Sequence, residues 1–325
     1  MLRITFQDEC YENHTDETVL DCLKRHQVDY PCGCQSGICQ SCLAQLTDGE
    51  MDSSWQKGLK ETLLAKNYFL ACLAKPKEDI SLALPGLDDI TRPAQIKKIQ
   101  YLNKNVICLA LLVSETTLWT PGQYLNLINF EGCRRSYSIA NVPEEDGYIA
   151  LHIKLMPNGV MSAWLKNTAH PGCNVCLQGP MGDCFYTNPS KESFPMVLAG
   201  TGTGLAPLLA IVRDALRQQH KGQITLIHGG VCAEDLYLDE KLKQLAKQHK
   251  QLAYKSCVLN GDGIHQESTI DKVVLNTLKN NPRAKVYVCG PEATTKKLKT
   301  TAFLAGVPSA LIYSDAFLDN SYAKP

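Results

Sequence analysis

The chain has 325 residues, of which 44% are hydrophobic and 20% are charged, and its 33 Lys and Arg residues balance 33 Asp and Glu residues. This length predicts two or three domains. The composition is typical of a folded globular protein, and it argues against a disordered chain and against nucleic acid as the main partner.

The N-terminus and the apolar runs predict a location. The segment MLRITFQDEC has no basic stretch followed by a long apolar core, so it does not resemble a signal peptide. No apolar run approaches the ~20 residues that span a membrane. We therefore expect a cytoplasmic protein with no membrane partner, in which the fifteen cysteines are thiols or metal ligands.

The charge is distributed unevenly along the chain. Residues 1–90 contain 8 Lys and Arg and 15 Asp and Glu, a net charge of −7, so the remaining residues carry +7. Opposite charges on two parts of a chain can attract each other or steer a charged partner. An acidic face that is simply solvated is an equally open interpretation.

Residues 1–88 are expected to form a first domain, a small sheet with a helix packed on it. The predicted strands lie at 2–6 and 43–47, and the predicted helix lies at 16–25. An acidic residue or Thr18 is expected to open that helix. The segment LPGLDDITRP (84–93), rich in Pro, Gly and Asp, is the first candidate linker.

Within this domain the motif YPCGCQSGICQSC places Cys34, Cys39 and Cys42 at the spacing C-x4-C-x2-C, and Cys72 follows thirty residues later. This is the spacing of plant-type [2Fe–2S] ferredoxins. Thiolates also suit zinc, but four-cysteine zinc sites usually pair two C-x2-C knuckles, and here there is one. We predict these four cysteines as metal ligands, with Cys32 as a loop residue nearby.

After residue 93 the chain changes to short strands separated by turn signals, with candidates at 106–113, 123–130, 135–140, 149–155 and 174–178. This density of strands predicts an antiparallel barrel. From about residue 194 the strands alternate with helices; the strands are expected at 196–199, 224–228, 254–259 and 285–289, and the helices up to 219 and at 237–249, 269–278 and 292–304. Such alternation predicts a parallel sheet with both faces covered.

The segment RRSYS in the middle domain carries a possible cofactor site. Side chains alternate along a strand, so Arg135 and Tyr137 point one way and Ser136 and Ser138 the other. A cationic fork beside an aromatic ring suits a phosphorylated aromatic cofactor. Surface decoration of a barrel strand is the alternative.

Two further segments are typical of phosphate binding. Gly159-Val160-Met161-Ser162 opens the one helix predicted in the middle domain, and free N–H groups at a helix start can bind pyrophosphate; an ordinary capped helix is the alternative. Gly200-Thr201-Gly202-Thr203-Gly204 lies between a strand and a helix, with a spacing related to the common dinucleotide motif. A tight turn with no ligand is the alternative there.

Together these motifs resemble the reductase components of bacterial oxygenase systems, over essentially the whole chain. The order is similar to that of aromatic-ring dioxygenase reductases such as naphthalene dioxygenase reductase, and RRSYSIAN and SDAF are also similar to segments of the reductases for CDP-sugar 3-deoxygenation. The resemblance implies a multi-domain protein: an α+β ferredoxin-like (β-grasp) [2Fe–2S] domain at 1–88, an antiparallel β-barrel FAD domain at 93–190 and an α/β parallel-sheet NAD(P)H domain at 191–325.

The resemblance also implies roles for the residues of the middle domain. Arg135 is expected to hold the FAD phosphates, Tyr137 to pack on the isoalloxazine ring and Ser138 to lie near its reactive nitrogen, with Ser136 among the cofactor-binding residues. The helix start from Gly159 through Val160 and Met161 to Ser162 is expected at the pyrophosphate.

In the last domain the resemblance assigns the loop from Gly200 to Gly204 to NAD and Cys289-Gly290-Pro291 to the nicotinamide. Phe317, in the segment SDAF, is expected to cover the flavin, although the chain continues for eight residues and Tyr322 is a less favoured substitute. Ser138, Cys289 and Phe317 are the expected catalytic residues.

The implied reaction passes electrons from NADH to FAD, to the [2Fe–2S] cluster and on to a terminal oxygenase or an intermediate ferredoxin. NADH is favoured over NADPH because HGGVCAED (228–235) contains acids and no Arg or Lys. Three alternatives are open: a reductase for CDP-4-keto-6-deoxyglucose 3-dehydrase, a stand-alone flavin reductase, and a non-catalytic zinc or iron–sulfur interaction module.

Overall fold

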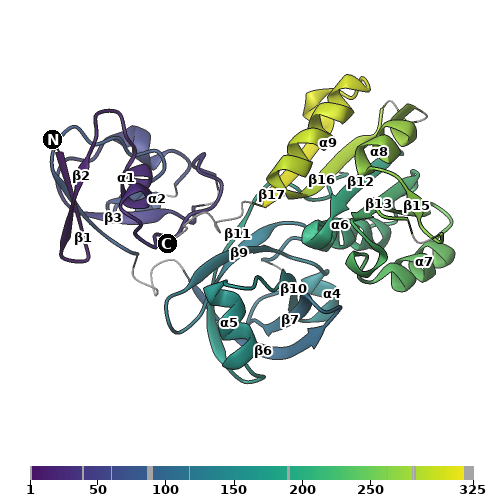
Figure 1. Cartoon of the computed structure of the whole chain (residues 1–325), viewed down its shortest axis with the longest axis horizontal. Helices are drawn as coiled ribbons and strands as arrows, with labels where there is room; N and C mark the ends of the chain where they lie inside the picture. Colours follow the sequence, from purple (N-terminus) through teal and green to yellow (C-terminus); the bar gives the residue numbers. More distant parts are fainter. Residues whose placement is uncertain are drawn as a thin grey trace.

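The structure, a computed structural model, describes residues 2–38, 40–59, 61–85, 91–116, 118–188, 191–261, 263–279, 281 and 283–317. Its strands form three sheets that follow one another along the chain (Figure 1). We call the corresponding parts the cysteine-loop module (residues 2–85), the antiparallel module (91–188) and the parallel module (191–317). The domain boundaries given above stay a prediction.

A five-stranded mixed sheet forms the cysteine-loop module. Its order is β2 (Glu9–Asn13), β1 (Leu2–Phe6), β5 (Ile80–Ala83), β3 (Leu43–Asp48) and β4 (Tyr68–Leu70). Helix α1 (Val19–Arg25) begins later than the predicted 16–25. Its N-cap is Thr18, one of the two expected openings, and the Thr18 hydroxyl accepts a hydrogen bond from the Asp21 N–H. A 3-10 turn (Ser53–Gln56) and the short helix α2 (Glu61–Leu64) precede β4. The apolar face of α1 packs on the sheet and gives the module its own core.

The antiparallel module is built on a six-stranded sheet. Its order is β10 (Ile149–Lys154), β7 (Val106–Leu112), β6 (Arg92–Tyr101), β11 (Asn174–Met181), β8 (Tyr124–Ile128) and β9 (Arg134–Ser138). The edge strands approach each other through an isolated bridge between Ile139 and Leu151, so the sheet is barrel-like. Helix α4 (Pro143–Asp146) and helix α5 (Val160–Asn167) flank it.

Strand β6 differs from the sequence prediction. The sequence predicts no strand there and a candidate linker that ends at Pro93. In the structure Arg92 and Pro93 belong to β6, and residues 86–90 lie outside the described part. Polar side chains fill most positions of β6, and only Ala94 and Ile96 are buried. Pairing with β7 and β11, and not apolar periodicity, makes this segment a strand.

The parallel module has a six-stranded parallel sheet. Its order is β15 (Gln266–Glu267), β14 (Leu252–Val258), β13 (Ile224–Gly230), β12 (Met196–Thr201), β16 (Lys285–Pro291) and β17 (Ile312–Phe317). Its helices are α6 (Leu205–Arg217), α7 (Asp239–Gln248), α8 (Ile270–Lys279) and α9 (Glu292–Leu304), with 3-10 turns at Gly202–Gly204, Ala233–Asp235 and Ser309–Leu311. The expected alternation of strands and helices is confirmed. In the described parts of the chain, no helix is both long enough and apolar enough to cross a membrane.

Candidate functional site

The cysteine loop brings predicted metal ligands together. The sulfur of Cys34 accepts hydrogen bonds from the backbone N–H groups of Ser36 (3.4 Å) and Ile38 (3.3 Å). Cys42 and Cys72 are buried, at 2% and 9% exposure. The pKa of the Cys72 thiol lies below its ordinary value, chiefly because the Cys42 thiol hydrogen-bonds to it. Three of the four predicted thiols therefore lie in one electrostatic environment.

Glycine at position 37 favours the shape of this loop. Gly37 has a φ of +79°, and a Cβ there would come within 2.7 Å of the Leu73 side chain. Cys39 lies outside the described residues. Within those residues no group of three His, Cys, Asp or Glu side chains forms a metal-holding set, so the ligand roles stay a prediction. Donation of N–H groups to a sulfur nevertheless fits the thiolates of an iron–sulfur cluster.

A buried cation that lacks hydrogen-bond partners at two of its nitrogens, among the described residues, lies next to this loop. The side chain of Arg134 on β9 is 6% exposed, and its Nε and Nη1 atoms have no hydrogen-bond partner among the described residues. Burial lowers its pKa, and Tyr30 is the group whose charge opposes that effect. Tyr30 in turn interacts with Cys42 and Cys72. A buried cation is costly without a counter-charge, so this one fits an anionic group close by, such as a cluster held by thiolates.

Strand β9 connects the antiparallel module to both of its neighbours. The hydroxyls of Ser136 and Ser41, which precedes Cys42, are 3.0 Å apart. Two residues farther along the same face, the Ser138 hydroxyl donates to Asp315 Oδ2 on β17 at 2.7 Å. One face of a five-residue strand thus contacts the cysteine-loop module at Ser136 and the parallel module at Ser138.

The other face of β9 carries Arg135 and Tyr137, as alternation predicted. Both are half-buried, and Arg135 Nη1 donates to the Arg134 carbonyl at 2.8 Å. Tyr137 packs against the core of the antiparallel module, and burial raises the pKa of its hydroxyl. A cation and an aromatic ring are therefore presented side by side, which fits a flavin with its phosphates. Their binding roles stay a prediction.

Asp315 is a titratable group at the contact between the antiparallel and parallel modules. Burial raises its pKa to about 6, while the hydrogen bond from Ser138 acts in the opposite direction. Cys289, predicted as catalytic, is completely buried, and its sulfur lies 3.7 Å from that of Cys184. Burial raises the pKa of the Cys289 thiol. Phe317 ends β17 and pairs in register with Pro291.

The glycine-rich loop lies at the carboxyl end of β12, beside the corresponding end of β16. Cβ atoms at Gly200 and Gly204 would both collide with the carbonyl of Cys289. These two glycines are therefore required by the close approach of the loop to the segment Cys289–Pro291. The predicted nucleotide residues from both strands meet at the sheet edge where open α/β sheets bind ligands.

The predicted pyrophosphate site at α5 is less direct. Gly159 has extended backbone at the helix start, but the Ser162 hydroxyl accepts a hydrogen bond from the Met156 N–H at 2.9 Å. Ser162 and Met161 are buried and Val160 is exposed. The Ser162 hydroxyl thus supports the loop before the helix, and the pyrophosphate role of this segment stays a prediction.

Sequence reasoning left four residues of these contacts out of its site. Ser41 and Arg134 lie inside the predicted motifs but were given no role there, and Asn126 lies outside them; the partners of all three lie in other parts of the chain. Asp315 could have been predicted from the sequence, because it belongs to the SDAF segment, but no role was given to it.

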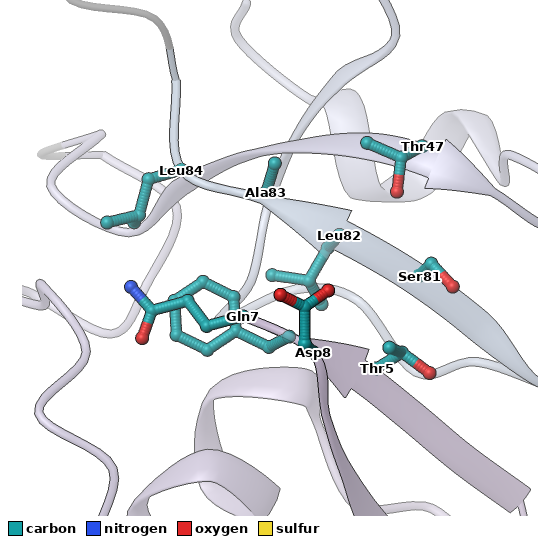
Figure 2. Close-up of a pocket in the computed structure, with 9 residues that line it drawn as sticks. Thr5, Gln7, Asp8, Thr47, Ser81, Leu82, Ala83 and Leu84 are labelled. Atoms are coloured by element: carbon teal, nitrogen blue, oxygen red, sulfur yellow. The ribbon is translucent and has the colours of Figure 1, made fainter.

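A hollow of about 410 Å³ lies on the cysteine-loop module, between the β1–β2 turn and strands β3 and β5; Figure 2 shows the residues that line it. Gln7, Asp8, Thr47 and Ser81 are among its lining residues. The lining contains no thiol and no cation, so we assign it no part in the chemistry of the site.

The chain is similar to known proteins along its length. Three family models match it: a 2Fe-2S iron-sulfur cluster binding domain at 4–77, an oxidoreductase FAD-binding domain at 93–186 and an oxidoreductase NAD-binding domain at 198–299. It is 30% identical over 308 residues to the ferredoxin–NAD(P)+ reductase component of a naphthalene 1,2-dioxygenase system from Pseudomonas putida, covering 92% of this chain and 93% of that one.

Two other similarities bear on function. The chain is 30% identical over 311 residues to the CDP-6-deoxy-L-threo-D-glycero-4-hexulose-3-dehydrase reductase of Yersinia pestis, covering 93% of each. Its fold matches the crystal structure of an Amycolatopsis cytochrome P450 reductase, with a TM-score of 0.67, 26% identity and coverage of 98% and 99% of the two chains.

Proposed function

The chain belongs to the family of oxidoreductases that join a [2Fe–2S] domain, an FAD domain and an NAD(P)H domain as reductase components of oxygenase systems, and we propose that it passes electrons from NADH to a partner oxygenase or its ferredoxin. The cofactors supply the chemistry, since a flavin accepts a hydride and a two-iron cluster accepts single electrons. The protein supplies binding and geometry.

We propose that Cys34, Cys39, Cys42 and Cys72 hold the cluster. The N–H donors to Cys34 and the buried cation of Arg134 support this ligand set, because both stabilise negative charge on a cluster. Thiols of this kind persist in a reducing compartment, which supports a cytoplasmic location.

For the flavin we propose Arg135 as the phosphate ligand and Tyr137 as the ring that packs on the isoalloxazine. Ser138 and Asp315 form a hydrogen-bonded pair at the proposed meeting point of flavin and nicotinamide. With a pKa of about 6, the Asp315 carboxyl is mostly protonated below about pH 6 and mostly ionised above it, so it can hold and release a proton. Cys289-Gly290-Pro291 and Phe317 would border the nicotinamide.

The contacts of β9 carry this proposal. The strand that presents Arg135 and Tyr137 reaches the cysteine loop through Ser136 and the nucleotide module through Ser138. These two contacts support a hydride acceptor held at β9 between the hydride donor and the one-electron acceptor. A metal-binding interaction module without catalysis would not need this arrangement.

We propose NADH as the donor because acids occupy the end of β13. Asp235 Oδ2 accepts hydrogen bonds from the N–H groups of Val231 (3.0 Å) and Cys232 (3.2 Å), and Glu234 lies beside it. A 2′-phosphate at this position would meet negative charge and would find these N–H groups already occupied. Equal or better kcat/KM with NADPH would contradict this preference.

A reductase of CDP-sugar 3-deoxygenation is the second candidate, since the Yersinia pestis reductase is as similar in sequence as the dioxygenase reductase. Reconstitution with each class of acceptor would separate the two.

The first test is an anaerobic titration of the purified protein with NADH and then with NADPH, followed by visible absorbance and electron paramagnetic resonance. We expect the flavin to bleach and a reduced [2Fe–2S] signal to appear with NADH. Bleaching without any cluster signal would overturn the cluster assignment and leave a flavin reductase with a structural metal domain. A colourless protein would overturn the redox function altogether.

A further inference from the structure

A buried polar network joins the cysteine loop to the antiparallel module. Asn126 on β8 is 0% exposed, and its Oδ1 accepts hydrogen bonds from the hydroxyls of Ser41 at 3.1 Å and Ser136 at 2.6 Å. Its Nδ2 donates to Gln178 Oε1 on β11 at 2.9 Å. One amide therefore binds two strands of its own module and the loop of another.

The network favours one docked arrangement of the loop. Ser41 and Gln178 are 3% and 5% exposed, whereas Ser136 is exposed, so the hydrogen bonds that Asn126 makes with Ser41 and Gln178 are the ones that form away from water. Hydrogen bonds are directional, and a buried acceptor left without its donor is disfavoured. Removing the Ser41 hydroxyl leaves Asn126 Oδ1 with only the hydrogen bond from Ser136, and each such bond favours the docked arrangement by roughly fivefold.

The network lies between the two proposed electron-transfer groups. Ser41 directly precedes the predicted ligand Cys42, and Ser136 directly precedes Tyr137 on the strand proposed to face the flavin. The hydroxyls of Ser41 and Ser136 are 3.0 Å apart. Both hydroxyls donate to Asn126 Oδ1, so one shared acceptor joins the residues next to the two proposed electron-transfer groups.

We propose that Ser41 and Asn126 are positioning residues for electron transfer from the flavin to the cluster. They hold the cysteine loop on β8 and β9 and so fix the separation of the two groups. In this step one electron leaves the reduced flavin and enters the cluster, and no bond forms or breaks between them. The proposal rests on the proposed function, and it goes beyond it by naming side chains that bind neither cofactor.

The test compares Ser41→Ala with Ser53→Ala, which removes an exposed hydroxyl from the same module. Rapid mixing with NADH gives the rate of flavin bleaching, and rapid-freeze electron paramagnetic resonance gives the rate of cluster reduction. Hydrogen exchange of the peptide covering residues 40–45 reports on docking without any need for turnover.

For Ser41→Ala we expect flavin bleaching at the wild-type rate, cluster reduction roughly threefold to tenfold slower and faster exchange in residues 40–45. For Ser53→Ala we expect no change. Unchanged cluster reduction would overturn the proposal, and so would unchanged exchange. Loss of bound iron, or equal slowing of both steps, would also overturn it, because these results indicate a structural role alone.

Asn126→Ala and the double variant extend the test. If Ser41 acts through Asn126, the double variant should exchange no faster than Asn126→Ala alone; additive effects would overturn the pairing. Should Asn126→Ala not fold, Ser41→Ala against Ser53→Ala still decides. If wild-type protein shows no cluster signal with NADH, the proposed function fails, whereas the exchange comparison still reports on the network.

Discussion

The antiparallel module contacts its two neighbours in different ways. Towards the parallel module it shares apolar clusters: Val106 and Cys184 pack with side chains of the parallel sheet and of α6, and Ala140 and Ala150 pack with Ala206. Among the described residues, by contrast, the apolar core of the cysteine-loop module contains only residues between positions 4 and 84. The first contact is a continuous core, and the second is mainly polar.

We call the contact between the antiparallel and parallel modules the seam. Polar contacts stabilise the seam as well. Arg213 on α6 holds Asp146 with two hydrogen bonds of 2.8 Å, and the His152 ring contacts the Tyr237 hydroxyl at 3.2 Å. Hydride transfer requires donor and acceptor in fixed contact, whereas electron transfer needs only a controlled separation. The antiparallel and parallel modules therefore share a core, whereas among the described residues the cysteine-loop module meets the antiparallel module mainly through directional hydrogen bonds.

Cys72→Ser should have the largest effect, because it removes the function of the cysteine-loop module and leaves the other two modules intact. We expect the cluster signal to be lost. Electron transfer through the cluster should fall by more than roughly 100-fold, since that is the cost of losing a residue that only supports a metal ligand. Reduction of ferricyanide by NADH should continue, since the flavin and nucleotide sites share a separate core. Cys32→Ser is the matched control and should keep the cluster; loss of the cluster in that variant would contradict the ligand assignment.

The parts of this arrangement that sequence could predict are local in the chain. The thiol spacing, the alternation along RRSYS and the glycine loop each lie within a few residues, so their geometry follows from short-range rules. The cross-module contacts do not, because Ser41 is 85 residues from Asn126 and Ser138 is 177 residues from Asp315. Strand β6 was missed for a related reason, since its pairing partners and not its own polarity pattern define it.

Asp315→Ala tests the contact between the antiparallel and parallel modules. Loss of the acceptor for Ser138 should slow flavin reduction by NADH by roughly tenfold or more, because it loosens β17 relative to β9. Asp315→Asn keeps an acceptor oxygen and should retain most of the rate. Stopped-flow absorbance measures both. Exchange in residues 40–45 should not change in either variant, and a change there would mean that the two contacts of β9 are coupled.

His152 makes the same seam sensitive to acid. Burial, with a smaller effect of Lys241, lowers its pKa to about 3, while the unfolded chain titrates near the ordinary 6.5. Below pH 6.5 the unfolded state therefore binds the extra proton, and stability falls as the pH decreases from 6.5 towards 3, by up to about 1.4 kcal/mol per pH unit. His152→Gln keeps a polar partner for Tyr237 and should remove this share of the slope.

The check on His152 is chemical denaturation between pH 7 and pH 5. The exposed His170→Gln change on the same module is the control and should retain the wild-type slope. Part of the slope should persist in His152→Gln, because burial also lowers the pKa of His228 to about 4. An unchanged slope in His152→Gln would mean that the seam opens before the molecule unfolds.

Arg213→Gln and Arg25→Gln form the smallest and most closely matched test. Arg213 pairs with Asp146 across the seam, at side-chain exposures of 32% and 18%. Arg25 pairs with Glu17 inside the cysteine-loop module, at 34% and 14%, also through two short hydrogen bonds. Because each arginine is about a third exposed, solvent screens the pair, and we expect a cost of only about 1 kcal/mol in either variant.

The test is which of two calorimetric unfolding transitions each variant shifts to a lower Tm. If the cysteine-loop module unfolds separately, Arg25→Gln should lower only the Tm of the smaller calorimetric transition, by roughly 4–8 °C, because a small domain has a small unfolding entropy. Arg213→Gln should lower only the larger one, by roughly 2–4 °C, since its cost is spread over two modules that share a core. A single transition that both variants shift equally would show that the polar contact at Ser41 couples the modules as firmly as the shared apolar core does.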